Sequence, residues 1–279
     1  MAKILKNRYY FYTIKELLGD FVTKKQKQYP EIKLVNEGIF WKYSINICGN
    51  EEWFYVKKKS LNKYELYGAY YETFGDYSFN GHCYVRPEMK VNFNDIVIDA
   101  GGCEGYYSRY ALNMGAAKVI IFEPCSELAE GLKRTFKNEI DLGKVIVIEK
   151  ALGKEAHKDI LYINKNMFCA AKINNFGEVY DIEKDIFVSR LDDVLQEVGI
   201  SHIDILKMDV EGAEVDAVIG AKNIIRKCHP KLIIATYHSY YNSIRIHSIC
   251  KKLYSEYKCN LYGCYQYKRP WRPYITFLS

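Results

Sequence analysis

The sequence contains no run that approaches the ~18 consecutive apolar residues of a membrane-spanning helix. Residues 1–21 lack the apolar stretch of a secretion signal. The nine cysteines follow no repeated spacing, and Cys259 and Cys264 lie too far apart for a CxxC zinc knuckle. We therefore expect no membrane span, no disulfide framework and no zinc ribbon, but a cytoplasmic protein with mainly buried free thiols.

The composition is otherwise that of a globular protein. The 279 residues are 49% hydrophobic and 27% charged, which favours one large domain with additions over two equal domains. Much of the formal net charge of +6 comes from short lysine runs at 24–27 and 57–59. Such runs are usually solvated faces, although they leave an anionic partner open.

Short runs rich in Val and Ile alternate with helical patterns from Asp95 onward. The apolar runs lie at 95–100, 118–123, 145–149, 203–210 and 231–236. The helical patterns lie at 106–114, 126–138, 191–198, 214–225 and 243–257. This alternation predicts an α/β fold, a parallel sheet with helices on both faces.

Further strands are expected outside this alternation. Runs at 159–163 and 185–188 predict an inserted pair, which we interpret as an edge hairpin. The final runs, 260–267 and 274–278, are joined by KRPWRP, whose prolines favour a turn. An antiparallel hairpin is therefore expected to close the sheet.

The first ninety residues differ from the rest, since they are dense in Tyr, Phe, Trp and Lys. The pattern at 14–22 predicts an amphipathic helix, and GIFWKYSI and EEWFYVKKK predict strands. We interpret 1–89 as an N-terminal extension or cap, and 90–279 as the main domain. The aromatic residues of the extension suit a substrate wall, although packing against the main domain is their commoner use.

The stretch VIDAGGCEGYYSRYALNMGAAKVIIFEP carries the clearest chemical signal. Glycines at the first, third and sixth places would indicate a dinucleotide site, but Cys103 and Tyr106 break that pattern, and no GxxxxGK[ST] loop is present. The glycine turn instead follows Asp99, and Glu123 ends the next apolar run. The turn consists of Gly101, Gly102 and Gly105 together with their neighbours.

One ligand accounts for both acids. Asp99 can pair with an ammonium group, while the turn and the helix N-terminus can bind a carboxylate. Glu123, at the tip of the neighbouring strand, can accept hydrogen bonds from both hydroxyls of a ribose. S-adenosylmethionine (SAM) has an amino-acid end and a ribose, and we predict it as cofactor. The alternative is a turn that only permits helix packing, with Glu123 as a helix N-terminal charge.

These segments also resemble the FkbM-like branch of class I SAM-dependent methyltransferases. The similarity is carried by VIDAGGCEGYYS, VIIFEP, KALG, VSRLDDVL and, most specifically, IDILKMDVEGAEVDAVIGA. The resemblance implies a Rossmann-like seven-stranded mixed sheet of order 3-2-1-4-5-7-6, with its last strand antiparallel. Cys103 departs from the family, which often has a small polar residue there.

The resemblance also assigns site residues. It implies that Asp99, Gly101, Gly105 and Glu123 contact the cofactor and that Ala151 lies near the adenine. It further implies that Asp209 and Glu211 end the fourth strand, where the methyl donor meets the acceptor. We count Gly102 and Asp209 among the cofactor-binding residues as well.

Methyl transfer to a hydroxyl needs a group that takes up a proton, so carboxylates and histidines are the candidates. If the strand continues to Glu211, Asp209 and Glu211 share one face, and Lys207 points the same way and can orient either acid by an ion pair. Both acids have an alternative role in capping the following helix. His238, after the fifth strand, can act as a base or help Asp209 and Glu211 hold a divalent ion.

We therefore predict Asp209, Glu211 and His238 as catalytic, and we assign no metal site. Cys103 and Cys125 flank the turn without a paired base, so nucleophilic roles are not expected. The remaining histidines form no recognisable group. They are His82, His157, His202, His229 and His247.

The predicted function is O-methylation of a sugar hydroxyl on a glycan, nucleotide-sugar or glycosylated metabolite, because the family resemblance implies it. The alternatives are an RNA ribose methyltransferase, an N-methyltransferase of a peptide or small molecule, and a partner-binding subunit without turnover. After the fourth strand the sequence reads DVEG, which lacks the Pro-Pro-aromatic motif of base-amine methylation. We expect a small-molecule or glycan acceptor and no nucleic-acid partner, and we leave the oligomeric state open.

Overall fold

The central sheet has the predicted strand order. The computed structural model describes residues 6–7, 10–11, 30–47, 49–78, 80–173, 177–265 and 272–279. The sheet strands are β6 (Ile96–Ala100), β7 (Lys118–Phe122), β8 (Val145–Ile148), β13 (Ile205–Met208), β14 (Lys231–Ala235), β15 (Cys259–Tyr262) and β16 (Ile275–Leu278). Read from β8, their order is β8-β7-β6-β13-β14-β16-β15, and β16 runs antiparallel to both neighbours. This confirms the order 3-2-1-4-5-7-6 and the terminal hairpin.

Successive residues of the inner strands pack into different apolar layers. Val97 and Ile205 are fully buried in one layer, while Ile98 and Leu206 are fully buried in the other. Because side chains alternate along a strand, a strand that is covered on both faces must be apolar at consecutive positions. This is why these strands read as unbroken Val and Ile runs.

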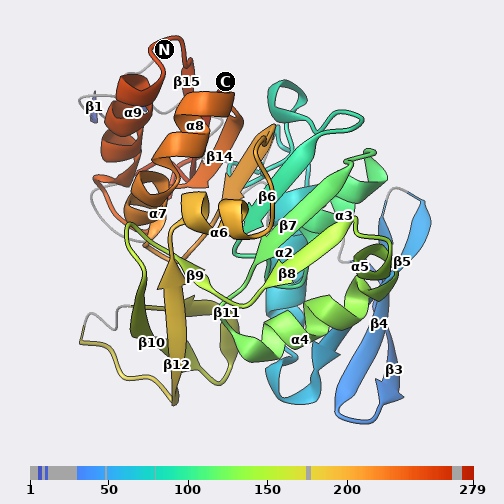
Figure 1. The fold of residues 1–279 in the computed structure, drawn as a ribbon. Helices are drawn as coiled ribbons and strands as arrows, with labels where there is room; N and C mark the ends of the chain where they lie inside the picture. Colours follow the sequence, from blue (N-terminus) through green and yellow to red (C-terminus); the bar gives the residue numbers. More distant parts are fainter. Residues whose placement is uncertain are drawn as a thin grey trace.

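Helices cover both faces of the sheet (Figure 1). One layer contains α3 (Tyr106–Asn113), α4 (Ser126–Thr135) and α5 (Lys137–Asp141). The other contains α6 (Leu191–Glu197), α7 (Glu214–Gly220), α8 (Lys222–Cys228) and α9 (Asn242–Leu253). In the part of the chain that the structure describes, no helix combines the length and apolar character needed to cross a membrane.

Two predicted helices are each divided into two. The pattern at 126–138 forms α4 and α5, which meet at the buried, non-helical Phe136. The pattern at 214–225 forms α7 and α8, which meet at the buried, non-helical Ala221. A Cβ on Gly220 would lie 2.0 Å from the carbonyl oxygen of Gly153, so only glycine allows this approach.

The insertion between β8 and β13 forms its own sheet. Its strands are β9 (Ala151–Leu152), β10 (His157–Asn164), β11 (Met167–Lys172) and β12 (Ile182–Ser189), in the order β11-β10-β12-β9. The prediction of an edge hairpin was therefore wrong. β10 and β12 do pair antiparallel, but they bury Leu161, Ile163 and Val188 in a separate apolar cluster and do not extend the main sheet.

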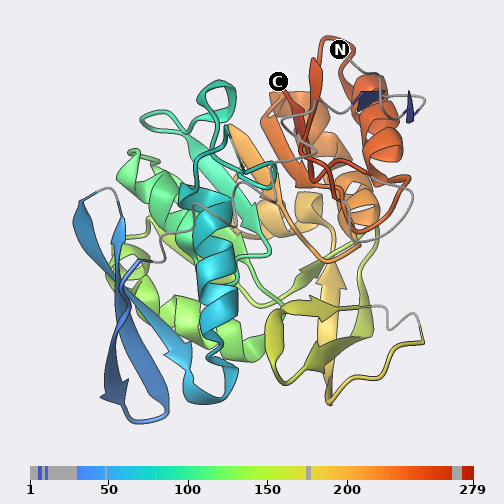
Figure 2. The ribbon, with the colours of Figure 1, turned by 180° about the vertical axis from the view of Figure 1, so that it is seen from behind.

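The N-terminal part supplies a further sheet and a helix. The predicted strands are confirmed as β4 (Phe40–Ile47) and β5 (Asn50–Lys57), with β3 (Lys33–Glu37) beside β4. Helix α2 (Lys63–Phe74) lies between this sheet and the inserted sheet (Figure 2). A short pair, β1 (Lys6–Asn7) and β2 (Tyr10–Phe11), and 3-10 turns at Lys58–Ser60 and Pro87–Met89 complete the elements. The helix expected at 14–22 and most of KRPWRP lie outside the described residues.

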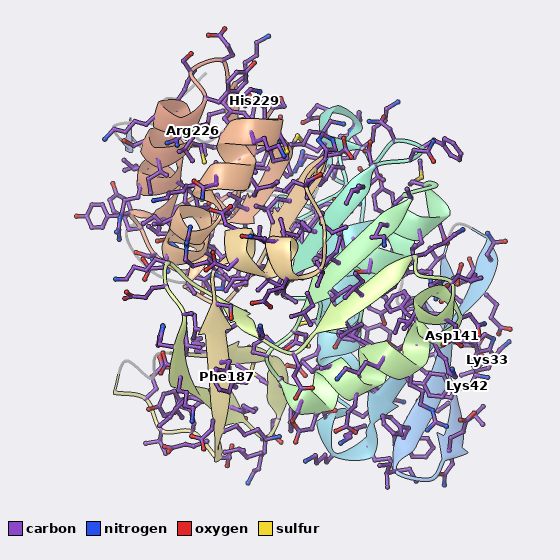
Figure 3. All side chains as sticks on the ribbon, in the orientation of Figure 1. Lys33, Lys42, Asp141, Phe187, Arg226 and His229 are labelled. Carbon is purple, nitrogen blue, oxygen red and sulfur yellow. The ribbon has the colours of Figure 1, made fainter. Side chains whose placement is uncertain are left out.

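The lysine run at 57–59 anchors this sheet to the main domain. Lys57 pairs with Glu130 at 2.6 Å, and Lys59 pairs with the buried Glu127 of α4, which also binds Lys184. The paired lysines lower the pKa of Glu127 to about 2 even though burial opposes ionisation. On the same sheet, Lys33 and Lys42 lie at the outer side of the molecule (Figure 3). Lys57 and Lys59 therefore hold the N-terminal sheet against α4, and the run at 57–59 gives no support to an anionic partner.

Candidate active site

Two pockets with shared walls lie at the carboxyl ends of the central strands. The first extends from the turn after β6 to α2, and the second extends from the same turn to Glu123 and β9. Residues common to both linings are Gly101, Cys103, Cys169, Asp209 and Glu211. Open parallel sheets bind ligands at this edge, so the two pockets define the candidate site.

The glycines of the turn permit close packing of protein on protein. Gly101 has a φ of +80°, and a Cβ there would lie 1.8 Å from the carbonyl oxygen of Asp209. Gly102 approaches the side chain of Ile121 closely, while Gly105 packs under Phe136 and starts α3. Gly101 and Gly102 line the pockets, whereas Gly105 acts through the placement of α3. Close packing is thus one role of the turn, which agrees with the alternative that the glycines permit helix packing.

Asp99 is fully buried and is not among the residues that line the pockets. Its carboxylate pairs with Lys207 at 2.9 Å and accepts a hydrogen bond from Ser108 at 2.7 Å. Lys207 also donates to the carbonyl of Gly101 at 2.7 Å. The expectation that Lys207 pairs with Asp209 or Glu211 was wrong, because β13 places it opposite Asp99 on β6. Direct pairing of Asp99 with a cofactor ammonium group stays a prediction.

Glu123 lines the second pocket together with Ala151. One carboxylate oxygen accepts the backbone N–H of Cys103 at 3.0 Å, and the other accepts that of Cys125 at 2.9 Å. Burial raises the pKa of Glu123 to about 7, although these two N–H groups favour ionisation. Each carboxylate oxygen can accept a further hydrogen bond. The two acceptor oxygens of Glu123 therefore fit a ligand that presents two neighbouring hydroxyls.

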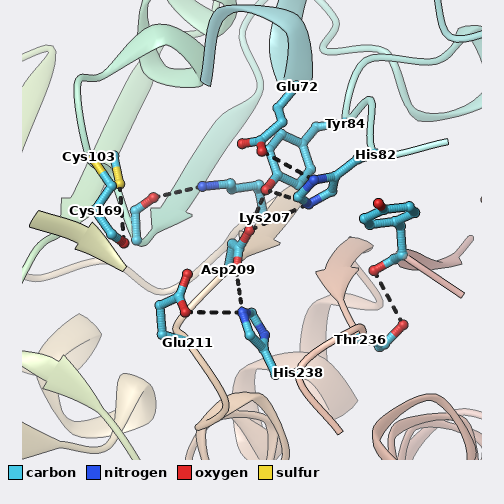
Figure 4. A network of polar contacts seen from close by, with 12 residues as sticks. Glu72, His82, Tyr84, Cys103, Cys169, Lys207, Asp209, Glu211, Thr236 and His238 are labelled. Atoms are coloured by element: carbon cyan, nitrogen blue, oxygen red, sulfur yellow. Dashed lines mark hydrogen bonds and ion pairs between the residues drawn. The ribbon is translucent and has the colours of Figure 1, made fainter. Parts of the chain in front are cut away.

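Asp209, Glu211 and His238 are brought together, but not by the expected geometry. β13 ends at Met208, and Glu211 has a left-handed φ of +52°, so the two acids do not alternate along a strand. The turn instead directs both toward His238. Its Nε2 lies 3.3 Å from Glu211 Oε2 and 3.7 Å from Asp209 Oδ1 (Figure 4).

A buried acid fixes the orientation of His238. Glu214 is completely buried, and its Oε1 lies 2.9 Å from His238 Nδ1. The same oxygen accepts the backbone N–H of Gly212, and the other accepts the side chain of Asn242. Burial disfavours the charged ring, but Glu214 and Glu211 outweigh this effect and raise the pKa of His238 well above its usual value.

The helix-capping alternative for Asp209 and Glu211 is wrong. The N-cap residue of α7 is Ala213, and the backbone N–H groups of Val210 and Gly212 just before the helix donate to Glu214. Asp209 instead accepts a hydrogen bond from the hydroxyl of Tyr84. Burial opposes its ionisation, but His82, His238 and Lys207 together lower the pKa of Asp209.

Three residues of the site were missed by the sequence analysis. His82 lies 3.7 Å from Asp209 Oδ2 and 3.1 Å from Glu72, and Tyr84 lies beside it (Figure 4). Burial disfavours the charged ring of His82, yet Glu72 and Asp209 raise its pKa to about 9. The statement that His82 belongs to no group was therefore wrong. The only signal was the polar-aromatic stretch HCY just before the main domain.

The eight cysteines of the described part are free thiols, as expected. Cys125 is fully buried, and burial raises the pKa of its thiol to about 12. A thiol with so high a pKa has almost no thiolate near neutral pH and is a poor nucleophile. This agrees with the absence of a paired base.

The strand order, the glycine turn and the acids at the strand ends together indicate a Rossmann-like methyltransferase. Residues 99–255 match the family model of the methyltransferase FkbM domain, and the chain belongs to this family. A similar curated protein is the methyltransferase sdnD of Sordaria araneosa, 27% identical over 190 residues, which cover 58% of this chain and 71% of that protein.

Among solved structures, the methyltransferase FkbM of Methylobacillus flagellatus KT has a similar fold. The TM-score is 0.50 and the sequence identity 17%, and the match covers 80% of this chain. The chain spans 56% of the length of that protein. At this identity the likeness supports the fold, and it leaves the acceptor to be inferred from the site.

Proposed function

We propose that this protein methylates a hydroxyl of a sugar in a glycan, nucleotide-sugar or glycosylated metabolite. The supporting observation is that the glycine turn, Asp209 and Glu211 line the same pockets, with His238 Nε2 3.3 Å from Glu211. Bound SAM would supply a methyl group on a positively charged sulfur. The protein then has to hold an acceptor oxygen in line with that methyl group and accept its proton.

The residues present fit SAM. Glu123 would accept the ribose hydroxyls, Ala151 would lie against the adenine, and the turn at Gly101 and Gly102 would border the amino-acid end. The fit rests on the free acceptor positions of the buried Glu123 carboxylate. Asp209, which its cationic neighbours keep ionised, would accept a hydrogen bond from the acceptor hydroxyl.

The wall of the first pocket narrows the choice of acceptor. Helix α2 contributes Glu65 and Glu72, and the turn contributes the buried Glu104. Burial raises the pKa of Glu65 to about 8 and also raises the pKa of Glu104, so Glu65 is largely protonated near neutral pH. Such carboxyl groups can both donate and accept hydrogen bonds, which suits the hydroxyls of a neutral sugar better than the phosphates of a nucleotide-sugar or RNA. The wall also accommodates an amine, which makes N-methylation of a cationic small molecule the second candidate. The extension would thus act as the acceptor wall.

Isotope transfer tests the acceptor class directly. The protein is incubated with methyl-labelled SAM and fractionated cell extract, and then with a neutral glycoside, a nucleotide-sugar, an amine and RNA at equal concentration. We expect label in the neutral carbohydrate fraction, in a product stable to ribonuclease. Label in RNA or in the nucleotide-sugar alone would contradict the argument from the carboxyl-rich wall.

Replacement of Glu123 tests the cofactor site. Glu123→Ala is expected to weaken SAM binding about ten-fold or more, because it removes two hydrogen bonds to a charged acceptor. The pKa of Glu123, about 7 in the free protein, adds a pH dependence. Affinity should fall as the pH is lowered from about 8 to about 6, since the protonated acid accepts fewer hydrogen bonds. Glu123→Gln should remove this dependence.

Calorimetric titration with SAM measures both effects. Glu149→Gln is the matched control, since Glu149 is an exposed acid just after β8 that pairs with Lys133 at 3.0 Å. Its affinity and pH profile should match the unmodified protein. Unchanged affinity in Glu123→Ala would remove this carboxylate from the ribose.

A further inference from the structure

The side chains of Asp209, Glu211 and His238 direct donor atoms at one point. One ligand atom from each lies within 4.8 Å of the other two, and His238 Nε2 lies 3.3 Å from Glu211 Oε2 and 3.7 Å from Asp209 Oδ1. Donors bound to one first-row metal ion at about 2.1 Å lie about 3 to 4 Å apart. The separations of His238 Nε2 from the two carboxylate oxygens fall in this range, so the three side chains are already placed to bind one ion.

The buried atoms of this cluster without a hydrogen bond among the described residues are Asp209 Oδ1 and both ring nitrogens of His238, whose side chain is only 9% exposed. Nδ1 faces Glu214, while Asp209 Oδ1 and His238 Nε2 face the cluster. Buried polar atoms are nearly always satisfied, so their lack of partners at a shared point indicates a missing ligand. The other oxygen of Asp209 is bound by Tyr84, which leaves Oδ1 directed at the cluster.

The neighbours of His238 form the support that metal-binding histidines need. Glu214 Oε1 lies 2.9 Å from Nδ1, the nitrogen remote from the cluster, and Glu214 is itself bound by Asn242 and two backbone N–H groups. A metal ion would displace the proton of Nε2, and the carboxylate behind the ring would then hold the remaining proton on Nδ1. An isolated acidic surface patch has no such arrangement.

We propose that Asp209, Glu211 and His238 bind a divalent ion of the first transition row. Two carboxylates and one imidazole favour Mn²⁺, Fe²⁺ or Zn²⁺ over Mg²⁺ and Ca²⁺, which prefer oxygen ligands alone. Three protein ligands leave coordination positions open toward the first pocket, which Asp209 and Glu211 line. Resting on the proposed function, the ion would bind the acceptor hydroxyl and make its proton easier to remove.

Mn²⁺ binding tests the site without any methyl transfer. Electron paramagnetic resonance and calorimetry of the chelator-treated protein should show one Mn²⁺ bound with a Kd below about 100 μM. His238→Gln and Glu211→Gln should each weaken binding about ten-fold or more, and Glu214→Gln should do so through loss of ring orientation. His157→Gln is the control, because His157 is an exposed histidine paired with Asp159.

These measurements test the metal site independently of the proposed methyl transfer. Circular dichroism confirms that the variants are folded, and SAM titration of the same samples reports the cofactor site. No Mn²⁺ or Zn²⁺ binding to the unmodified protein, or binding that survives in both His238→Gln and Glu211→Gln, would overturn the metal site. Binding of Mg²⁺ but not of Mn²⁺ would overturn the donor argument. Failure of the methyl-transfer assay alone would leave the metal site standing.

Discussion

Asp209→Asn is expected to slow methyl transfer about a hundred-fold or more, with SAM binding nearly unchanged. The change conserves shape but removes the negative charge that His82, His238 and Lys207 stabilise. An amide placed there would present an N–H either to the hydroxyl of Tyr84 or to the pocket, so the acceptor oxygen loses its anionic partner. Gly101 approaches only the backbone of Asp209, which the substitution leaves in place.

Single-turnover transfer and SAM titration separate the two effects. Asp185→Asn on β12 serves as the control, because Asp185 is exposed and lies outside both pocket linings. It should retain the normal rate. A normal rate in Asp209→Asn would show that Asp209 only holds Tyr84 and His82 in place. A loss of SAM binding equal to the loss of rate would make it a cofactor residue.

The sequence predicted the parts of the site that belong to the sheet. Val97 and Ile98 lie in an apolar run that indicates a strand buried on both faces. Asp99 and Glu123 lie near the ends of two such strands. Because parallel strands end at one edge of the sheet, the order of the strands suffices to bring such residues near each other. This explains why the positions of Asp99 and Glu123 near the carboxyl ends of β6 and β7 could be predicted from the sequence.

The acceptor side could not be read in the same way. His82 reaches Asp209, and Glu72 reaches His82, because α2 and the segment after it pack across the strand ends. Such long-range contacts have no sequence periodicity. The shared face expected for Asp209 and Glu211 required the strand to continue to Glu211, but the left-handed backbone of Glu211 directs its side chain to His238. Pairing of Lys207 with Asp99 depends on the register of β13 against β6, which apolar runs do not specify.

Gly101→Ala is expected to destabilise the fold by about 4 kcal/mol or more. The new Cβ would lie 1.8 Å from the carbonyl oxygen of Asp209, which is backbone and cannot rotate away. The N–H of Asp209 is bound to Ala100 at 2.9 Å, so relief of the clash requires β6 and β13 to separate at the site. The cofactor turn and the acid after β13 would then move together.

The comparison with Gly199→Ala distinguishes this clash from the cost of a positive φ alone. Gly199 has a φ of +72°, close to that of Gly101, but nothing lies within 4 Å of the position that its Cβ would take. Its substitution should therefore cost only about 1 to 2 kcal/mol, the ordinary penalty of a left-handed residue. Urea unfolding of both variants measures the difference. Equal losses would mean that backbone strain, and not contact between β6 and β13, explains the glycine at 101.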